Sequence, residues 1–157
     1  MADIYELSLA VDLRDDLSDA ELAELRWHLG LAPRPDSLSI VRAFPFVVGN
    51  DLGELVTEDD PAPLLGQHGE ARKVAGALTS VLLRREESRH GGWALTARQE
   101  AHPDDFDRLG ELLSWLATKT VQHHERLDGS VELGWIRFYE SDQPNPLTVR
   151  DAGVSWP

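Results

Sequence analysis

Hydrophobic and polar residues alternate strictly at the start of the chain. In the segment IYELSLAVDL (residues 4–13), every second position from Tyr5 to Leu13 is apolar, and a period of two is typical of a strand with one buried face. Residues 18–21 (SDAE) then have the form of a capping box, in which the side chains at both ends satisfy free backbone N–H groups. The sequence therefore predicts a strand followed by a helix that ends at Gly30.

Similar patterns continue along the chain. Apolar runs predict strands over residues 38–49, 74–86, 93–100 and 131–140, with a short further strand in LTVR (147–150). Pro103 and the acidic residues after it predict the start of a second helix, because proline and negative charge both suit the first helical turn. This helix carries Leu109, Leu113 and Leu116 on one stripe.

Turn residues separate these elements. Asn50–Gly53 predicts a turn after which residues 54–57 pair back as a short hairpin arm, and residues 88–92 predict a tight turn. Residues 50–73 as a whole are a long irregular connection rich in Pro, Gly and acidic residues, and loops of this length are often functional.

The order of elements predicts an α+β fold in a single domain over residues 1–157. Two β-α-β-β units suggest a ferredoxin-like arrangement, which is a mainly antiparallel sheet with two main helices on one face. A tandem duplication with pseudo-repeats 1–87 and 92–157 is one reading, since LAELRWHL (22–29) aligns without gaps to LGELLSWL (109–116). Chance similarity between two amphipathic helices is the other reading.

Composition narrows the class of protein. The 157 residues carry a net charge of −13 and contain no cysteine, which excludes disulfides, thiolate nucleophiles and cysteine-ligated metals. The amino-terminal segment lacks the basic region of a signal peptide, and the chain has no apolar run long enough to span a bilayer. We therefore expect a soluble cytoplasmic protein that binds neither nucleic acid nor membranes, because its charge repels anionic surfaces.

The basic residues also point to an origin. Only Lys73 and Lys119 are lysines among the 15 basic residues, and together with abundant Ala, Asp and Gly this bias is typical of a GC-rich genome. The chain as a whole resembles an uncharacterised family of hypothetical proteins from high-GC actinobacteria. The resemblance implies no activity and no functional residue.

Two strands carry apolar residues on both faces. If residues 131–140 alternate without interruption, Ile136 and Phe138 lie on the other face of the strand from Leu133. Val41 and Val47 lie on the corresponding face of the strand predicted over residues 38–49. Two helices cover only one face of a sheet, so we expect these side chains to need another cover. A homodimer is favoured, and a monomer covered by residues 50–73 or by the tail is the alternative.

These considerations give the candidate pocket or interface. Its members combine the apolar residues expected on the uncovered face, an arginine able to hold a carboxylate there, and an aromatic residue in the tail that needs a docking place. They are Val41, Val47, Arg98, Ile136, Phe138 and Trp156.

The sequence contains no recognisable catalytic or nucleotide-binding motif. His123 and His124 are adjacent near the end of the second predicted helix, where neighbouring side chains diverge by about 100°, so we expect no metal site and no cofactor. Catalytic residues stay unknown. The favoured function is a non-catalytic module that binds a small ligand or a protein. The alternatives are a cofactor-independent ferredoxin-like enzyme, of the monooxygenase or isomerase type with an apolar sheet-face pocket, and an accessory protein that contacts a larger partner through residues 50–73.

Overall fold

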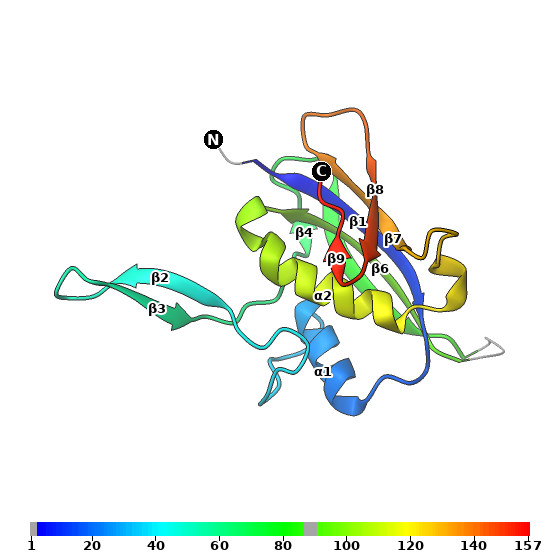
Figure 1. Ribbon diagram of the computed structural model, residues 1–157, viewed down its shortest axis with the longest axis horizontal. Coiled ribbons are helices and arrows are strands. Elements are labelled where there is room, and N and C mark those ends of the chain that lie inside the picture. The colour runs from blue at the N-terminus through cyan, green and yellow to red at the C-terminus, as the bar shows by residue number, and fades with distance from the viewer. Residues whose placement is uncertain (1–2, 87–90) are drawn as a thin grey trace.

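The computed structural model describes residues 3–86 and 91–157. Within these residues the chain forms a seven-stranded antiparallel sheet, a separate two-stranded hairpin and two α-helices (Figure 1). The elements in chain order are β1 (Tyr5–Leu13), α1 (Asp19–His28), β2 (Pro45–Gly49), β3 (Leu55–Asp59), β4 (Gly69–Glu70), β5 (Ala77–Arg84), β6 (Trp93–Ala101), α2 (Phe106–Lys119), β7 (Val131–Phe138), β8 (Asn145–Arg150) and β9 (Gly153–Val154). Two short 3-10 turns, η1 (Pro103–Asp105) and η2 (Gln122–His124), flank α2.

The large sheet has the strand order β4-β5-β6-β1-β7-β8-β9. Strand β1 lies in its middle and pairs antiparallel with β6 along its whole length, from Tyr5 opposite Ala101 to Leu13 opposite Trp93. It pairs with β7 over its first half only. The expected α+β class with a mainly antiparallel sheet and two main helices is therefore confirmed.

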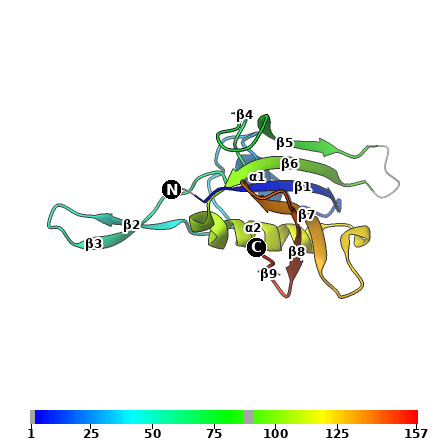
Figure 2. The ribbon, with the colours of Figure 1, turned by 90° about the horizontal axis from the view of Figure 1, so that it is seen from above.

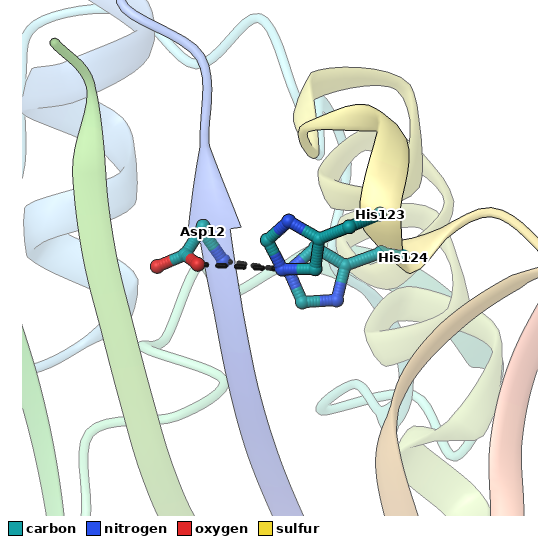
Figure 3. Close-up of side chains that lie close together, drawn as sticks. All are labelled: Asp12, His123 and His124. Carbon is teal, nitrogen blue, oxygen red and sulfur yellow. Dashed lines mark hydrogen bonds and ion pairs between the residues drawn. The ribbon is translucent and has the colours of Figure 1, made fainter. Parts of the chain in front are cut away.

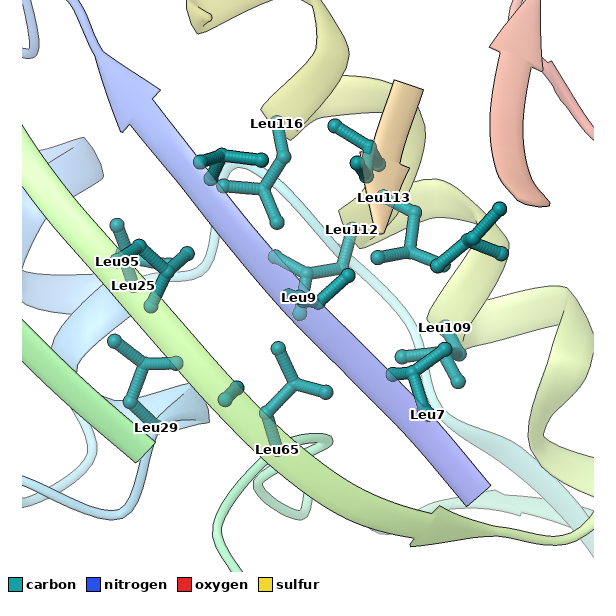
Figure 4. Close-up of a cluster of buried hydrophobic side chains, with 14 of the residues drawn as sticks. Leu7, Leu9, Leu25, Leu29, Leu65, Leu95, Leu109, Leu112, Leu113 and Leu116 are labelled. Atoms are coloured by element: carbon teal, nitrogen blue, oxygen red, sulfur yellow. The ribbon is translucent and has the colours of Figure 1, made fainter. Parts of the chain in front are cut away.

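One face of this sheet forms the hydrophobic core together with both helices. The inward residues of β1 are buried, as the alternation predicts, and they pack with leucines of α1 and α2 (Figure 4). Leu25 and Leu29 come from α1 and its end, and Leu109 and Leu116 come from α2; each is at most 2% exposed. None of the helices in the described part of the chain is both long and apolar enough to cross a membrane.

The first helix begins and ends as its sequence predicts. The Ser18 side chain accepts a hydrogen bond from the Glu21 N–H, and the Glu21 carboxylate accepts one from the Ser18 N–H, so the capping box is formed. After the helix, Gly30 adopts a left-handed φ of +71°, which a residue with a side chain rarely takes.

The prediction of a strand over all of residues 38–49 is wrong in its first half. Only residues 45–49 form a strand, β2. The N–H groups of Ser39, Ile40 and Val41 instead donate to the buried carboxylate of Glu24 in α1. Because these donors are occupied by a side chain, the segment cannot enter a sheet ladder there.

The face assigned to Ile136 and Phe138 is also wrong. Strand β7 contains an irregularity between Glu132 and Gly134, and such a bulge reverses which residues point to each face. Ile136 therefore lies opposite Leu7 on the helix-covered side, where it is fully buried. Phe138 follows on the same side opposite Tyr5.

The remaining boundaries are close to those expected. Strands β5, β6, β7 and β8 occupy the predicted segments with ends shifted by a few residues, and the hairpin arm after Asn50 is present as β3. The turn predicted over residues 88–92 falls largely on residues 87–90, outside the described residues.

Candidate functional site

The most prominent feature of the surface is the β2–β3 hairpin, which projects away from the body of the protein (Figures 1 and 2). Its two strands pair from Pro45 opposite Asp59 to Gly49 opposite Leu55. At the tip, Asn50 Oδ1 accepts hydrogen bonds from backbone N–H groups two and four residues further on, at 3.0 and 2.9 Å. An Asn side chain that binds the backbone in this way fixes a turn.

The base of the hairpin is held to the body. Phe44 precedes β2 and is buried in the core. The two arms of the hairpin are joined beside this anchor, because the Phe44 N–H donates to Asp59 Oδ1 at 2.5 Å and the Phe44 carbonyl oxygen accepts a hydrogen bond from the Asp60 N–H at 3.0 Å. The hairpin therefore leaves the body from a fixed point.

The outer part of the hairpin exposes large apolar side chains. Val47 is 63% exposed, Leu52 82% and Leu55 80%. The register places Val47 and Leu55 on one face of the ribbon, with Leu52 at the tip beyond them. An exposed apolar group of this kind on an ordered element is typical of a contact surface.

The same stretch is strongly acidic. Residues 43–71 contain no Lys or Arg, and their acidic residues are Asp51, Glu54, Glu58, Asp59, Asp60 and Glu70. The hairpin thus combines apolar side chains with a negative field, and we call residues 45–59 the acidic hairpin.

A cleft of about 440 Å³ lies between the hairpin base, the connection that follows it and the start of α2. Phe44, Phe46 and Pro63 supply apolar lining, and Gln67 and Arg108 supply polar groups. Its size suits a small amphipathic molecule.

On the face of the sheet opposite the helices, three charged side chains form a cluster. Glu6, whose side chain is 5% exposed, accepts hydrogen bonds from Arg98 Nε at 2.8 Å and from an Arg137 guanidinium N–H at 2.5 Å. Burial raises the pKa of Glu6, but the hydrogen bonds and charges of the two arginines outweigh it and hold that pKa below its usual value. The carboxylate is therefore ionised, and this part of the face is charged.

A second polar cluster lies beside the last part of β1, which does not pair with β7. The chain after α2 runs beside the end of β1, with the Val121 N–H donating to the Asp12 carbonyl oxygen at 3.0 Å. This brings His123 and His124 to Asp12 (Figure 3). His123 Nε2 lies 3.4 Å from Asp12 Oδ2, and His124 Nε2 accepts a hydrogen bond from the Asp12 N–H at 2.9 Å.

The expectation that the two imidazoles diverge is wrong. Their ring centroids are 4.1 Å apart with an angle of 40° between the planes. The physical reason is that the α-helix ends at Lys119 and the histidines lie in the 3-10 turn η2 or at its end, so α-helical spacing does not apply to them.

The six residues expected to form a pocket or interface lie in different places. Val41 and Ile136 are fully buried, Val47 is on the acidic hairpin, and Arg98 belongs to the Glu6 cluster.

Trp156 and Phe138 belong to one row of aromatic rings. Trp156 stacks on Phe106 of α2 at 4.0 Å, and Phe106 and Phe138 each contact Tyr5. The carboxy-terminal tail is thus docked on the second helix. The role of any of the six residues in a pocket or interface stays a prediction.

Gln99 is a residue beside the cleft that the sequence pattern did not single out. Gln99 is 1% exposed on the core side of β6, where its amide donates to the Gln67 carbonyl oxygen and accepts from the Gln67 N–H, fixing the connection that lines the cleft. A polar residue in an otherwise apolar stripe was the available signal. No pattern in the sequence indicates that Asp12 contacts His123 and His124, because they are 111 and 112 residues away.

No protein-family model matches the chain, and comparison with the curated proteins and with the solved structures finds no match either.

Proposed function

We propose that this chain is a protein-interaction module that contacts its partner through the acidic hairpin. The observation that carries the proposal is the exposure of Val47, Leu52 and Leu55 on an ordered, projecting ribbon. The 50–73 connection was already a candidate contact from its sequence, and the hairpin comprises its first part together with β2.

Energetics support this role. A two-stranded hairpin alone is at best marginally stable in water, and this one keeps the side chains of Val47, Leu52 and Leu55 in solvent. Burying one Val or Leu side chain contributes about 1.5–3 kcal/mol. Covering the three side chains therefore supplies several kcal/mol to a complex, before the cost of association is subtracted.

Charge specifies the chemistry of the partner. Since residues 43–71 hold acidic residues and no Lys or Arg, the complementary surface is a protein groove with apolar pockets and a basic rim. Nucleic acid has the wrong sign of charge. Attraction between such surfaces is screened by salt, so we expect association to slow as ionic strength rises.

Site-specific crosslinking in the host cell tests the proposal. A photoreactive residue at Leu52 should give a discrete crosslinked protein, whereas the same residue at Leu127 should not. Leu127 is a matched control because it is also fully exposed, at 111%, but lies outside the hairpin. Equal products from both positions would contradict the proposal.

The captured protein is then purified and its affinity is measured against paired variants. Leu52→Ser with Leu55→Ser should weaken binding at least about tenfold, because each loses apolar burial in the complex, while the melting temperature stays near that of the wild type. Leu127→Ser should change neither quantity. Limited proteolysis adds a check on the free protein: cleavage is expected first within residues 50–56, and resistance of that segment would count against a free contact surface.

We further infer a ferredoxin-like arrangement for the central part of the fold. It is supported by the order β5-β6-β1-β7 with antiparallel neighbours and by both helices lying on one face. A homodimer stays a prediction, and its support now comes from β5. The short strand β4 pairs with it only at Ala77 and Leu78, so the rest of β5 is an open edge, where Val81 is 40% and Leu83 62% exposed. A cytoplasmic location also stays a prediction.

The remaining functional alternatives have different support. A small ligand would occupy the cleft beside the hairpin base, which favours the ligand-binding form of the module. The cofactor-independent enzyme with an apolar sheet-face pocket has less support, because Glu6, Arg98 and Arg137 place charges on that face.

A further inference from the structure

We propose that Asp12, His123 and His124 form a binding site for a divalent transition-metal ion such as Zn²⁺. One ligand atom from each side chain lies within 4.8 Å of the other two. The site is at the opposite end of the molecule from the acidic hairpin (Figure 1), and the proposal does not depend on the proposed function.

The separations are close to those of a coordinated ion. Zinc lies about 2.1 Å from nitrogen and carboxylate ligands, so two ligands of a tetrahedral centre are about 3.4 Å apart. Asp12 Oδ2 and His123 Nε2 already have that separation, 3.4 Å. Closing the wider distance to His124 needs a movement on the order of 1 Å, which rotation of two side chains on a surface turn provides.

Neighbouring groups orient the ligands as they do in metal centres. Arg85 binds Asp12 Oδ1 at 2.5 Å, which leaves Oδ2 directed toward the histidines. Contacts of this kind fix the orientation of metal ligands.

Ion binding has identifiable costs. His124 Nε2 now accepts the Asp12 N–H, and the ion must displace that bond. The positive charge of Arg85 also opposes a cation. Both effects lower affinity, so we expect a site weaker than the closed structural zinc centres that have four protein ligands.

The ligand set and the surroundings specify the class of ion. Two imidazoles and one carboxylate favour Zn²⁺, Co²⁺ or Ni²⁺ over Mg²⁺ and Ca²⁺, which prefer oxygen ligands. His123 lines clefts of about 440 and 520 Å³ on its two sides. Three protein ligands beside open clefts leave coordination positions for water or for a small anionic ligand.

The test uses the full-length protein without an affinity tag, titrated with Zn²⁺ by calorimetry and with Co²⁺ by visible absorption. One ion per chain is expected. His123→Ala and Asp12→Asn should each weaken binding at least about tenfold, whereas His102→Ala, which removes an imidazole outside the cluster, should leave it unchanged. His123 is the more informative histidine, because its side chain is 61% exposed and its removal should leave the fold intact.

Nuclear magnetic resonance of the imidazole nitrogens gives a second readout. Zn²⁺ should shift the signals of His123 and His124 and leave those of His102 in place, while Mg²⁺ should shift none of them. Absence of saturable Zn²⁺ and Co²⁺ binding would overturn the proposal. Zn²⁺ binding that survives the combined replacement of His123 and His124 by Ala would overturn it as well.

Discussion

Replacing Glu24 by Gln tests how the long segment before β2 is held. Glu24 is fully buried, and its Oε1 accepts the N–H groups of Ser39 at 2.5 Å and Ile40 at 2.9 Å. Its Oε2 accepts the N–H of Val41 at 2.9 Å and lies 3.0 Å from His28 Nε2. An amide offers a single oxygen, so in Glu24→Gln the NH2 group must face at least one backbone N–H donor that the carboxylate now accepts.

The expected loss follows from these contacts. Hydrogen bonds to a charged group contribute about 1.5–3 kcal/mol each, and breaking a buried charged network usually costs about 3–5 kcal/mol. Glu24→Gln should therefore lower the free energy of unfolding by about 3–5 kcal/mol. For a chain of this size it corresponds to a fall of about 6–20 °C in the melting temperature.

Urea unfolding followed by circular dichroism and tryptophan fluorescence measures this loss. The matched control is Glu111→Gln, which makes the same change at an exposed position of α2 and should shift stability by less than about 0.5 kcal/mol. A loss below about 1 kcal/mol in Glu24→Gln, at an unchanged urea dependence, would refute the idea that the carboxylate holds the segment.

The same contacts predict an acid dependence. Burial raises the pKa of Glu24, but its backbone hydrogen bonds and His28 outweigh burial, so the folded-state pKa lies below the ordinary value of 4.5. Glu24 therefore contributes stability that is fully present above pH 4.5 and is lost as the pH falls through the folded-state pKa. Glu24→Gln should lack this part of the acid transition.

Three further predictions concern other parts of the fold. Gly134→Ala should lower the free energy of unfolding by about 2 kcal/mol or more, since its Cβ would lie within 1.8 Å of a β1 backbone oxygen. Gly129 is also at positive φ but in open space, so Gly129→Ala should cost less in the same urea assay. Burial lowers the pKa of His28 below 6.5, so the stability of the wild type should fall as the pH drops below that value. His28→Gln, which keeps an N–H donor, should make this fall between about pH 7 and 5 shallower, and an unchanged slope would show that His28 does not cause it. Trp156→Ala should cost about 1–3 kcal/mol through lost stacking on α2, and the fully exposed Leu127→Ala should cost nothing measurable in thermal unfolding.

Features set by local sequence could be predicted well. Strand β1 alternates without interruption, and α1 has both its capping box and its terminal Gly30 in the sequence. The turn at Asn50 was also predictable, because an Asn side chain reaches its own following backbone. In each case the groups that determine the structure are near neighbours in the chain.

Features set by distant groups were mispredicted or missed. The segment before β2 looks like a strand by its apolar residues, yet the donor groups of Ser39 to Val41 are taken by a glutamate 15 to 17 residues earlier. In β7, one bulge reverses the faces of Ile136 and Phe138. An alternation rule has no means of locating such a bulge, although Gly134 was a signal that one was possible.

The bulge also explains why the metal-ligand cluster exists. The pairing of β1 with β7 ends at Leu9, which lies opposite Gly134. The edge of β1 from Ala10 to Leu13 is therefore not paired with β7. The turn after α2 fills this edge, and His124 satisfies the Asp12 N–H that a paired strand would otherwise have bound. The irregular strand that made the sequence-based face assignment fail thus also creates the place where the two histidines and Asp12 meet.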